Sequence, residues 1–396
     1  MAVQSEYGQA PSKPPIWNDP RYRAIFFQLI VLGGVLGLGI YIVNNTMTNL
    51  ERQGIASGFS FLNTTAGFGI TMHLIPWSEE MTYGRAFVVS VLNTLLVSVI
   101  GIVLATILGF IIGVARLSRN WLVARLAAVY IEVFRNIPLL LQIFFWYFSV
   151  LRAVPGPRES IEAFGIFFLN NRGLYSPSPV FEPAFIVVPV ALVLAIVASV
   201  LLVRWARRRQ ERTGEWFPAY LASIAIVIGL PILAAAAMGF PMSWSYPELR
   251  GFNFQGGAVL IPEFVALVVA LSIYTASFIA EIVRAGILAV SHGQTEAAYS
   301  LGIKPSWTLR LVVIPQALRV IIPPLTSQYL NLTKNSSLAA AIAYPDLILV
   351  FAGTVLMQTG QAVEVIAMAM AVYLTLSLLI SAFMNWYNKR IALVER

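Results

Sequence analysis

Long apolar stretches alternate with short polar segments along most of the chain. Seven of these stretches are close to the ~20 residues that an α-helix needs to cross the hydrocarbon core of a bilayer. Each is therefore predicted to be a membrane-spanning helix. They cover residues 24–43, 87–113, 127–150, 184–203, 220–238, 259–283 and 363–383.

An eighth apolar region, residues 320–355, is too long for one helix and is interrupted by Lys334, Pro345 and Asp346. Irregular backbone at membrane depth is tolerated only where it faces protein or a water-filled path. We therefore predict one span followed by a re-entrant or interfacial segment. With about eight transmembrane helices, the chain is expected to be an all-α integral membrane protein.

The basic residues predict how these spans are oriented. Eight spans place both termini on one side, and cytoplasmic loops are enriched in Lys and Arg. With both termini cytoplasmic, the inner segments hold 18 of the 26 Lys and Arg residues and the outer segments hold six. We therefore expect both termini inside, with residues 1–23 as a cytoplasmic tail rather than a signal peptide.

The spans are not uniform along the chain. Residues 87–390 are expected to form the main transmembrane domain, and residues 1–86 to hold the tail, a first helix and an outer segment. Within the main domain, residues 151–257 contain two plain apolar helices and long outer loops, and look like an insertion. The arginine run at 207–209 is interpreted as a positive-inside anchor or a contact with anionic lipids.

The amino-acid composition argues against several other kinds of protein. The chain is 58% hydrophobic and only 11% charged, whereas soluble domains are about 25% charged. Its formal charge of +8 is explained by loop arginines, so we expect no nucleic-acid partner. The sequence has no Cys and only two histidines, His73 and His292, which argues against a metal site.

The loop after residues 259–283 has a pattern suited to docking. Gly302 is expected to end a short helix there, and Thr295 to cap its start. Glu296 lies in the first turn, where the helix dipole favours an anion. Ala297 and Ala298 leave one face nearly flat, so another protein can approach closely.

This pattern resembles the EAA loop of ABC importer permeases, the coupling helix that sits in a cleft of the ATPase subunit. Val312 and Ile314 stand where that pattern usually has Ile and Leu. The residues that carry the resemblance, within about residues 285–315, are Glu296, Ala297, Ala298, Gly302, Ile314 and Pro315.

Other segments resemble the polar amino-acid permeases of that family. They start at Asn93, Glu132, Ala280 and Lys334, and the last reads Lys-Asn-Ser-Ser-Leu. Shorter patches at 61–69, 171–173 and 249–251 resemble the larger permease of broad-specificity L-amino-acid importers.

The resemblance implies a type I ABC importer permease: a core of five helices, here with an added N-terminal helix and a two-helix insertion. It also implies a bacterial inner-membrane complex with a second homologous permease, a dimer of ATPase subunits, a periplasmic amino-acid-binding protein and membrane lipids. The sequence has no G-x-x-x-x-G-K-[ST] motif, so no P-loop is expected. The chain itself is expected to bind no cofactor and to be no enzyme, with ATP and Mg used by the partner ATPase.

Charged residues inside apolar spans are candidates for the transport path, because such residues usually face the bundle interior and have a partner. Arg135 or Lys334 could bind a substrate carboxylate, and Glu281 or Glu132 an ammonium group. Three structural alternatives remain: a Glu132–Arg135 pair, a Glu281–Arg284 pair, and helix packing by Lys334. The candidate path residues are Lys334, Asn335, Ser336, Ser337, Asn331, Glu281, Glu132, Arg135 and Gln142.

Other classes of protein were also considered. An ion-coupled secondary amino-acid transporter would explain the intramembrane charges but not the EAA-type loop, and the chain has no evident inverted repeat. An ABC permease for another small polar solute remains an alternative. A membrane-embedded enzyme is not supported, since the sequence has neither a His cluster nor a G-x-S-x-G motif.

Overall fold

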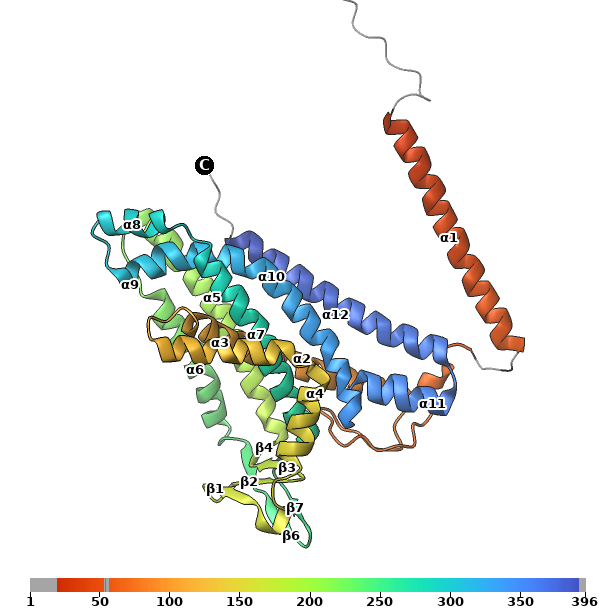
Figure 1. Cartoon of the computed structure of the whole chain (residues 1–396). Coiled ribbons are helices and arrows are strands. Elements are labelled where there is room, and N and C mark those ends of the chain that lie inside the picture. Colours follow the sequence, from red (N-terminus) through yellow and green to blue (C-terminus); the bar gives the residue numbers. More distant parts are fainter. Residues whose placement is uncertain (1–19, 53, 55–56, 392–396) are drawn as a thin grey trace, which may run out of the picture.

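The computed structural model describes residues 20–52, 54 and 57–391 of the chain. In this part of the chain, seven helices are long and apolar enough to cross a membrane, and an eighth span is formed if a bent helix pair counts as one. This matches the predicted number. The spans are α1 (Pro20–Arg52), α2 (Tyr83–Ala115), α3 (Trp121–Asn136) with α4 (Leu139–Phe144), α5 (Val187–Thr213), α6 (Ala219–Ala237), α7 (Pro262–Leu288), α10 (Ile314–Asn335) and α12 (Ala362–Ile391) (Figure 1).

The third predicted span, residues 127–150, is not one straight helix. α3 ends at Asn136, and the segment that follows turns away by 105°. Pro138 explains the break, because proline lacks an amide hydrogen and disfavours helical backbone in the residue before it. Beyond the break, α4 continues into a π-helical turn, Phe145–Leu151.

The outer loops of the predicted insertion contain short antiparallel strands. β1 (Ile161–Ala163), β2 (Phe167–Asn170), β3 (Gly173–Ser176) and β8 (Ala258–Leu260) form one sheet in that order. Two further pairs are β4 (Ser178–Phe181) with β5 (Met242–Ser245), and β6 (Glu248–Arg250) with β7 (Asn253–Gln255). All lie at one end of the molecule (Figure 1).

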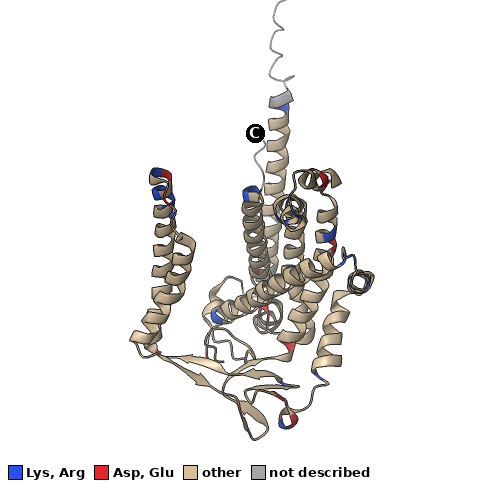
Figure 2. Ribbon diagram, turned by 90° about the vertical axis from the view of Figure 1, so that its left-hand side faces the viewer, with Lys and Arg blue, Asp and Glu red and all other residues tan. Residues whose placement is uncertain are grey.

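The helices α5 and α6 form a hairpin, here called the α5–α6 hairpin. Its two helices pack on each other and make few contacts with the other spans. It lies beside the rest of the bundle, and charged residues gather at its tip, at the end remote from the strands (Figure 2). α1 also stands apart, with no buried residue in its apolar window.

The eighth predicted region is irregular, as its sequence indicated. α10 ends at Asn335 and is followed by a 3-10 helix, Ser336–Ile342. Ala343 then adopts a left-handed conformation with φ of 60°. A π-helical segment, Ile348–Val355, and the short helix α11 (Leu356–Thr359) lead to α12.

α2 and α7 form the most extensive helix contact within the described residues, and small residues on α2 permit it. A Cβ atom added to Gly113 would lie 2.7 Å from the carbonyl oxygen of Ala280 and 2.8 Å from Cβ of Val283. Gly109, one turn earlier, is equally close to Ile279. Such spacing of small residues lets two membrane helices approach backbone to backbone.

We expect Gly113→Leu to destabilise the folded chain by about 1–3 kcal/mol, the usual cost of overpacking. The measurement is the thermal unfolding midpoint of the purified protein in detergent. Gly229→Leu is the matched control, because nothing lies within 4 Å of a Cβ at that position on α6. Equal midpoints for the two variants would contradict the close α2–α7 contact.

Candidate coupling helix and membrane path

The predicted docking helix is present as α8 (His292–Ser300), in the loop between α7 and α10. Gly302 follows its end with φ of +72°, a conformation that favours glycine. The amide of Gly302 donates to the carbonyl of Tyr299, and the amide of Ile303 donates to that of Ala298 (2.9 and 3.1 Å). These two bonds form a Schellman motif, which stops the helix here.

The start of α8 differs from the prediction. Thr295 does not cap the helix but lies inside it, because α8 begins at His292 after the N-cap residue Ser291. His292 Nδ1 lies 3.0 Å from Glu296 Oε1, one turn away on the same face. This polar contact supports the extra turn that the sequence pattern did not indicate.

The two alanines of the predicted docking face point in different directions. Ala297 is exposed, but Ala298 is only 4% exposed. The prediction that both form one flat outer face is therefore wrong for Ala298. α8 packs on the π-helical turn Leu309–Val313. Ala298 is therefore buried within the loop and is not available to a partner protein. The surface left free on α8 includes Glu296, Ala297 and Tyr299.

The remaining residues of the pattern lie where the loop returns to the bundle. α9 (Pro305–Thr308) runs into that π-helical turn, and α10 starts at Ile314. Ile314 and Pro315 are both exposed. Gln316 Nε2 donates to Gln294 Oε1 (3.2 Å), which ties the start of α10 to α8. The loop is thus held on both sides by spans.

Two acidic candidates differ in their surroundings. Glu281 forms a bidentate ion pair with Arg284 on the same helix, at 2.6 and 3.0 Å. This is the structural pair considered from the sequence, and it occupies both carboxylate oxygens. Glu132 forms no ion pair among the described residues, so the alternative of a Glu132–Arg135 pair is wrong. The guanidinium of Arg135 instead lies over the ring of Phe278, 5.1 Å from its centroid.

Gln142 is buried and bonded to backbone. Its Nε2 donates to the carbonyl oxygens of Phe134 and Ile137 (3.0 and 2.9 Å). Those carbonyls belong to the last turn of α3, where Pro138 interrupts the helical hydrogen bonds. Gln142 therefore stabilises the break between α3 and α4.

The polar run that begins at Asn331 is split between the surface and the interior. Asn331 and Lys334 are exposed, Asn335 and Ser337 are half-buried, and Ser336 is buried. Both serine hydroxyls donate to backbone carbonyls one turn back. In the described part of the chain, Lys334 forms no ion pair. Its ammonium group is the one member of the run that requires an anion or water.

A buried polar cluster fixes the irregular segment against α2. Asn93 Nδ2 donates to the carbonyls of Met72 and Pro345 (2.7 and 2.9 Å), and the Tyr344 hydroxyl donates to the Asn93 carbonyl (3.1 Å). The Leu347 amide donates to Thr94 Oγ1 (3.0 Å). Two of these three partners of Asn93, Tyr344 and Pro345, lie about 250 residues away in the sequence, so the sequence alone did not indicate this cluster.

Residues 105–393 match a protein family described as the binding-protein-dependent transport system inner membrane component. The chain belongs to this family. The match includes α7, α8 and α10, and so contains the candidate coupling helix and the irregular segment described above. This protein is therefore a membrane transport component, as the resemblance of its EAA-type loop indicated.

Curated members of the same family are similar over nearly the whole chain. The putative amino-acid ABC transporter permease YhdX of Escherichia coli is 58% identical, with 96% of each chain covered. The general L-amino acid permease AapQ of Rhizobium johnstonii is 55% identical, over 96% of this chain and 94% of its own. BztB of Rhodobacter capsulatus, a glutamate/glutamine/aspartate/asparagine transport system permease, is 46% identical with 96% coverage of each chain.

Proposed function

We propose that this chain is the permease subunit of an ATP-driven importer of L-amino acids. The observation that carries the proposal is its similarity, end to end, to three permeases whose names specify amino-acid transport. The exposed face of α8 supports the proposal. A short helix held between two spans can transmit a displacement of a separate ATPase subunit to those spans.

In this proposal ATP and Mg belong to a dimer of ATPase subunits, and α8 docks on one of them through Glu296 and Ala297. A periplasmic amino-acid-binding protein delivers the substrate, and a second permease completes the path. Ala298, Gly302, Ile314 and Pro315 hold the docking helix in place rather than touching the ATPase.

The proposed path runs along the polar side of α10. Lys334 supplies a positive charge for the substrate carboxylate, and Asn331, Asn335 and Ser337 supply neutral hydrogen bonds. We leave out Gln142 and Ser336, which are buried, and Glu281, whose carboxylate is paired. Arg135 and Glu132 are kept as secondary candidates because both are exposed.

The decisive experiment is reconstitution in liposomes of this permease with its ATPase, a second permease and a binding protein. We expect L-amino acids to stimulate ATP hydrolysis, and orthovanadate to stop uptake. Uptake driven by an ion gradient without ATP would instead establish a secondary transporter. Stimulation only by other small polar solutes would overturn the substrate class.

The proposed orientation places both termini and the tip of the α5–α6 hairpin in the cytoplasm. We expect Glu211→Cys, an exposed site near that tip in a Cys-free chain, to resist impermeant thiol reagents in intact cells. Labelling should appear only after the membrane is permeabilised. Ser243→Cys, exposed on β5 at the opposite end, is the matched control and should react at once. The reverse pattern would invert the proposed topology.

A further inference from the structure

The tip of the α5–α6 hairpin carries an unusual concentration of positive charge. Arg204, Arg208 and Arg212 follow one another at intervals of four residues, Arg207 lies next to Arg208, and all four are exposed. Side chains four residues apart share one side of a helix, where like charges repel each other. None of the four forms an ion pair within the described residues. Glu211, four residues after Arg207, offsets only part of this charge, so the face still favours an anion from outside the chain.

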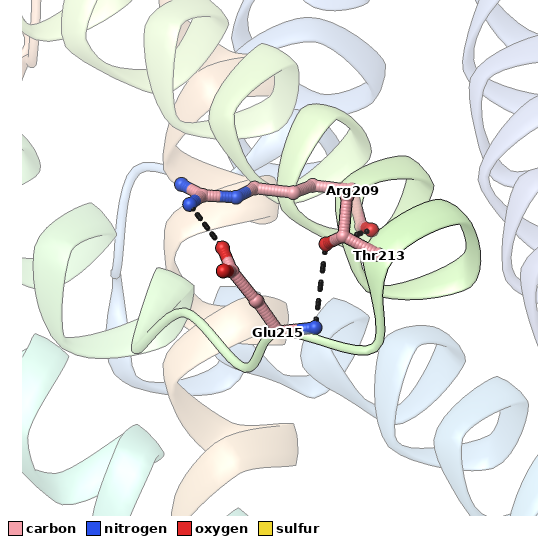
Figure 3. A network of polar contacts seen from close by, with 3 residues as sticks. All are labelled: Arg209, Thr213 and Glu215. Atoms are coloured by element: carbon pink, nitrogen blue, oxygen red, sulfur yellow. Dashed lines mark hydrogen bonds and ion pairs between the residues drawn. The ribbon is translucent and has the colours of Figure 1, made fainter.

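A fifth arginine at the tip has a different role. Arg209 forms an ion pair with Glu215, across the turn that joins the two helices (Figure 3). Thr213 Oγ1 donates to the carbonyl of Arg209 and accepts from the amide of Glu215 (2.9 and 3.3 Å). Arg209 thus closes the turn, and its charge is already compensated. It provides a matched comparison for the other arginines.

Next to this face the hairpin contains a pocket of about 210 Å³. Arg207, the arginine in its lining, donates from Nη2 to the Tyr220 hydroxyl (3.3 Å), and Gln210 lies one turn further along. The lining also includes the apolar side chains of Trp216 and Leu221. The pocket therefore combines a cationic donor with a hydrocarbon-like surface.

The position of the pocket indicates the depth at which its ligand lies. Within the chain the hairpin packs mainly on itself, and α6 is only 6% buried over its apolar window, which leaves an apolar outer surface suited to contact with lipid. Trp205, Trp216 and Tyr220 are 49%, 74% and 68% exposed near the tip. Trp and Tyr concentrate at the boundary between hydrocarbon and water, and basic pockets between membrane helices suit anionic lipid headgroups.

We propose that this pocket binds the headgroup phosphate of an anionic phospholipid. Arg207 and Tyr220 contact the phosphate, Arg204 and Arg208 add long-range attraction, and the wall of Trp216 and Leu221 contacts the first part of the acyl chains. A bound lipid then holds the tip of a hairpin that has little protein around it. This site is separate from the transport path and from the docking helix.

The test is native mass spectrometry of the delipidated full chain in detergent, titrated with phosphatidylglycerol or phosphatidylcholine of the same acyl chains. We expect phosphatidylglycerol to bind more tightly. Arg207→Gln should weaken its binding about five-fold, the contribution of one basic residue near an anionic lipid surface. Arg209→Gln, whose arginine is paired with Glu215, should leave binding within two-fold of the original chain.

Three results would overturn the proposal. These are unchanged binding by Arg207→Gln, equal loss in Arg209→Gln, or no preference between the two lipids. Inorganic phosphate at millimolar concentration distinguishes the two sources of the anion: full displacement by it would indicate a free-anion site instead of a lipid site. If Arg207→Gln does not fold, Tyr220→Phe decides, since loss of the hydroxyl should also weaken phosphatidylglycerol binding.

Discussion

Replacing Ala297 with tryptophan should reduce amino-acid uptake by about five-fold or more while leaving the chain folded and inserted in the membrane. Ala297 is exposed on α8, the proposed ATPase-docking helix. A bulky side chain on a closely fitted surface costs about 1–3 kcal/mol, which weakens docking by about five- to 150-fold. Uptake, retention of the ATPase during purification and the thermal unfolding midpoint are the three measurements.

Two comparisons make this result specific. Ala163→Trp places the same bulk on an exposed alanine of β1, at the other end of the molecule, and should leave uptake unchanged. Ala298→Trp should instead lower the unfolding midpoint, because Ala298 is buried against its own loop. Normal uptake by Ala297→Trp, with the ATPase still bound, would remove α8 from the coupling interface.

Lys334→Met should abolish most amino-acid uptake while basal ATP hydrolysis by the assembled transporter continues. Methionine keeps a similar length and removes the charge, so it tests the proposed contact with a substrate carboxylate. A lone charge at membrane depth costs at least about 2.5–3.5 kcal/mol, so a lysine there needs an anion or water as its partner. The measurements are uptake and ATPase activity of the same liposomes.

The matched control is Lys389→Met, an exposed lysine in the last turn of α12, which should transport normally. A complex that fails to assemble with Lys334→Met would assign this lysine to helix packing instead. Full uptake with unchanged stability would exclude both roles and move the path away from α10.

The spans could be predicted because hydropathy is a property of local sequence. A stretch of about 20 apolar residues must be helical in a bilayer whatever its neighbours are. The EAA-type loop was also visible, since Gly302 and the alanines have fixed offsets along one short segment. The strands β1 to β8 were not predicted, because each has only three or four residues, and such segments do not give a clear alternating pattern.

Other features depended on contacts that the sequence does not reveal. Ala298 is buried because one side of α8 packs on the π-helical turn Leu309–Val313. The sequence does not reveal which side of the helix that is. Glu132 lies three residues from Arg135, but Phe278 from another helix takes the guanidinium. The bend between α3 and α4 was indicated in the sequence by Pro138, but an average of hydropathy over a window of residues does not register a single proline. The small residues of α2, at four-residue intervals up to Gly113, are a sequence pattern from which its close packing on α7 could have been predicted.

α7 is an unbroken helix of the bundle core that links the strand end to the loop of α8. Its 27 residues contain no internal proline and no 3-10 or π turn, so it spans about 40 Å as one rod. α8 follows it directly at one end. At the other, Glu263 in its first turn accepts a hydrogen bond from the Tyr147 hydroxyl (2.7 Å). The α3–α4 segment and the stretch after α10 contain breaks, whereas α7 has none. If α8 is the coupling helix proposed above, we expect a displacement applied there to move α7 as one rigid body rather than to distort it locally.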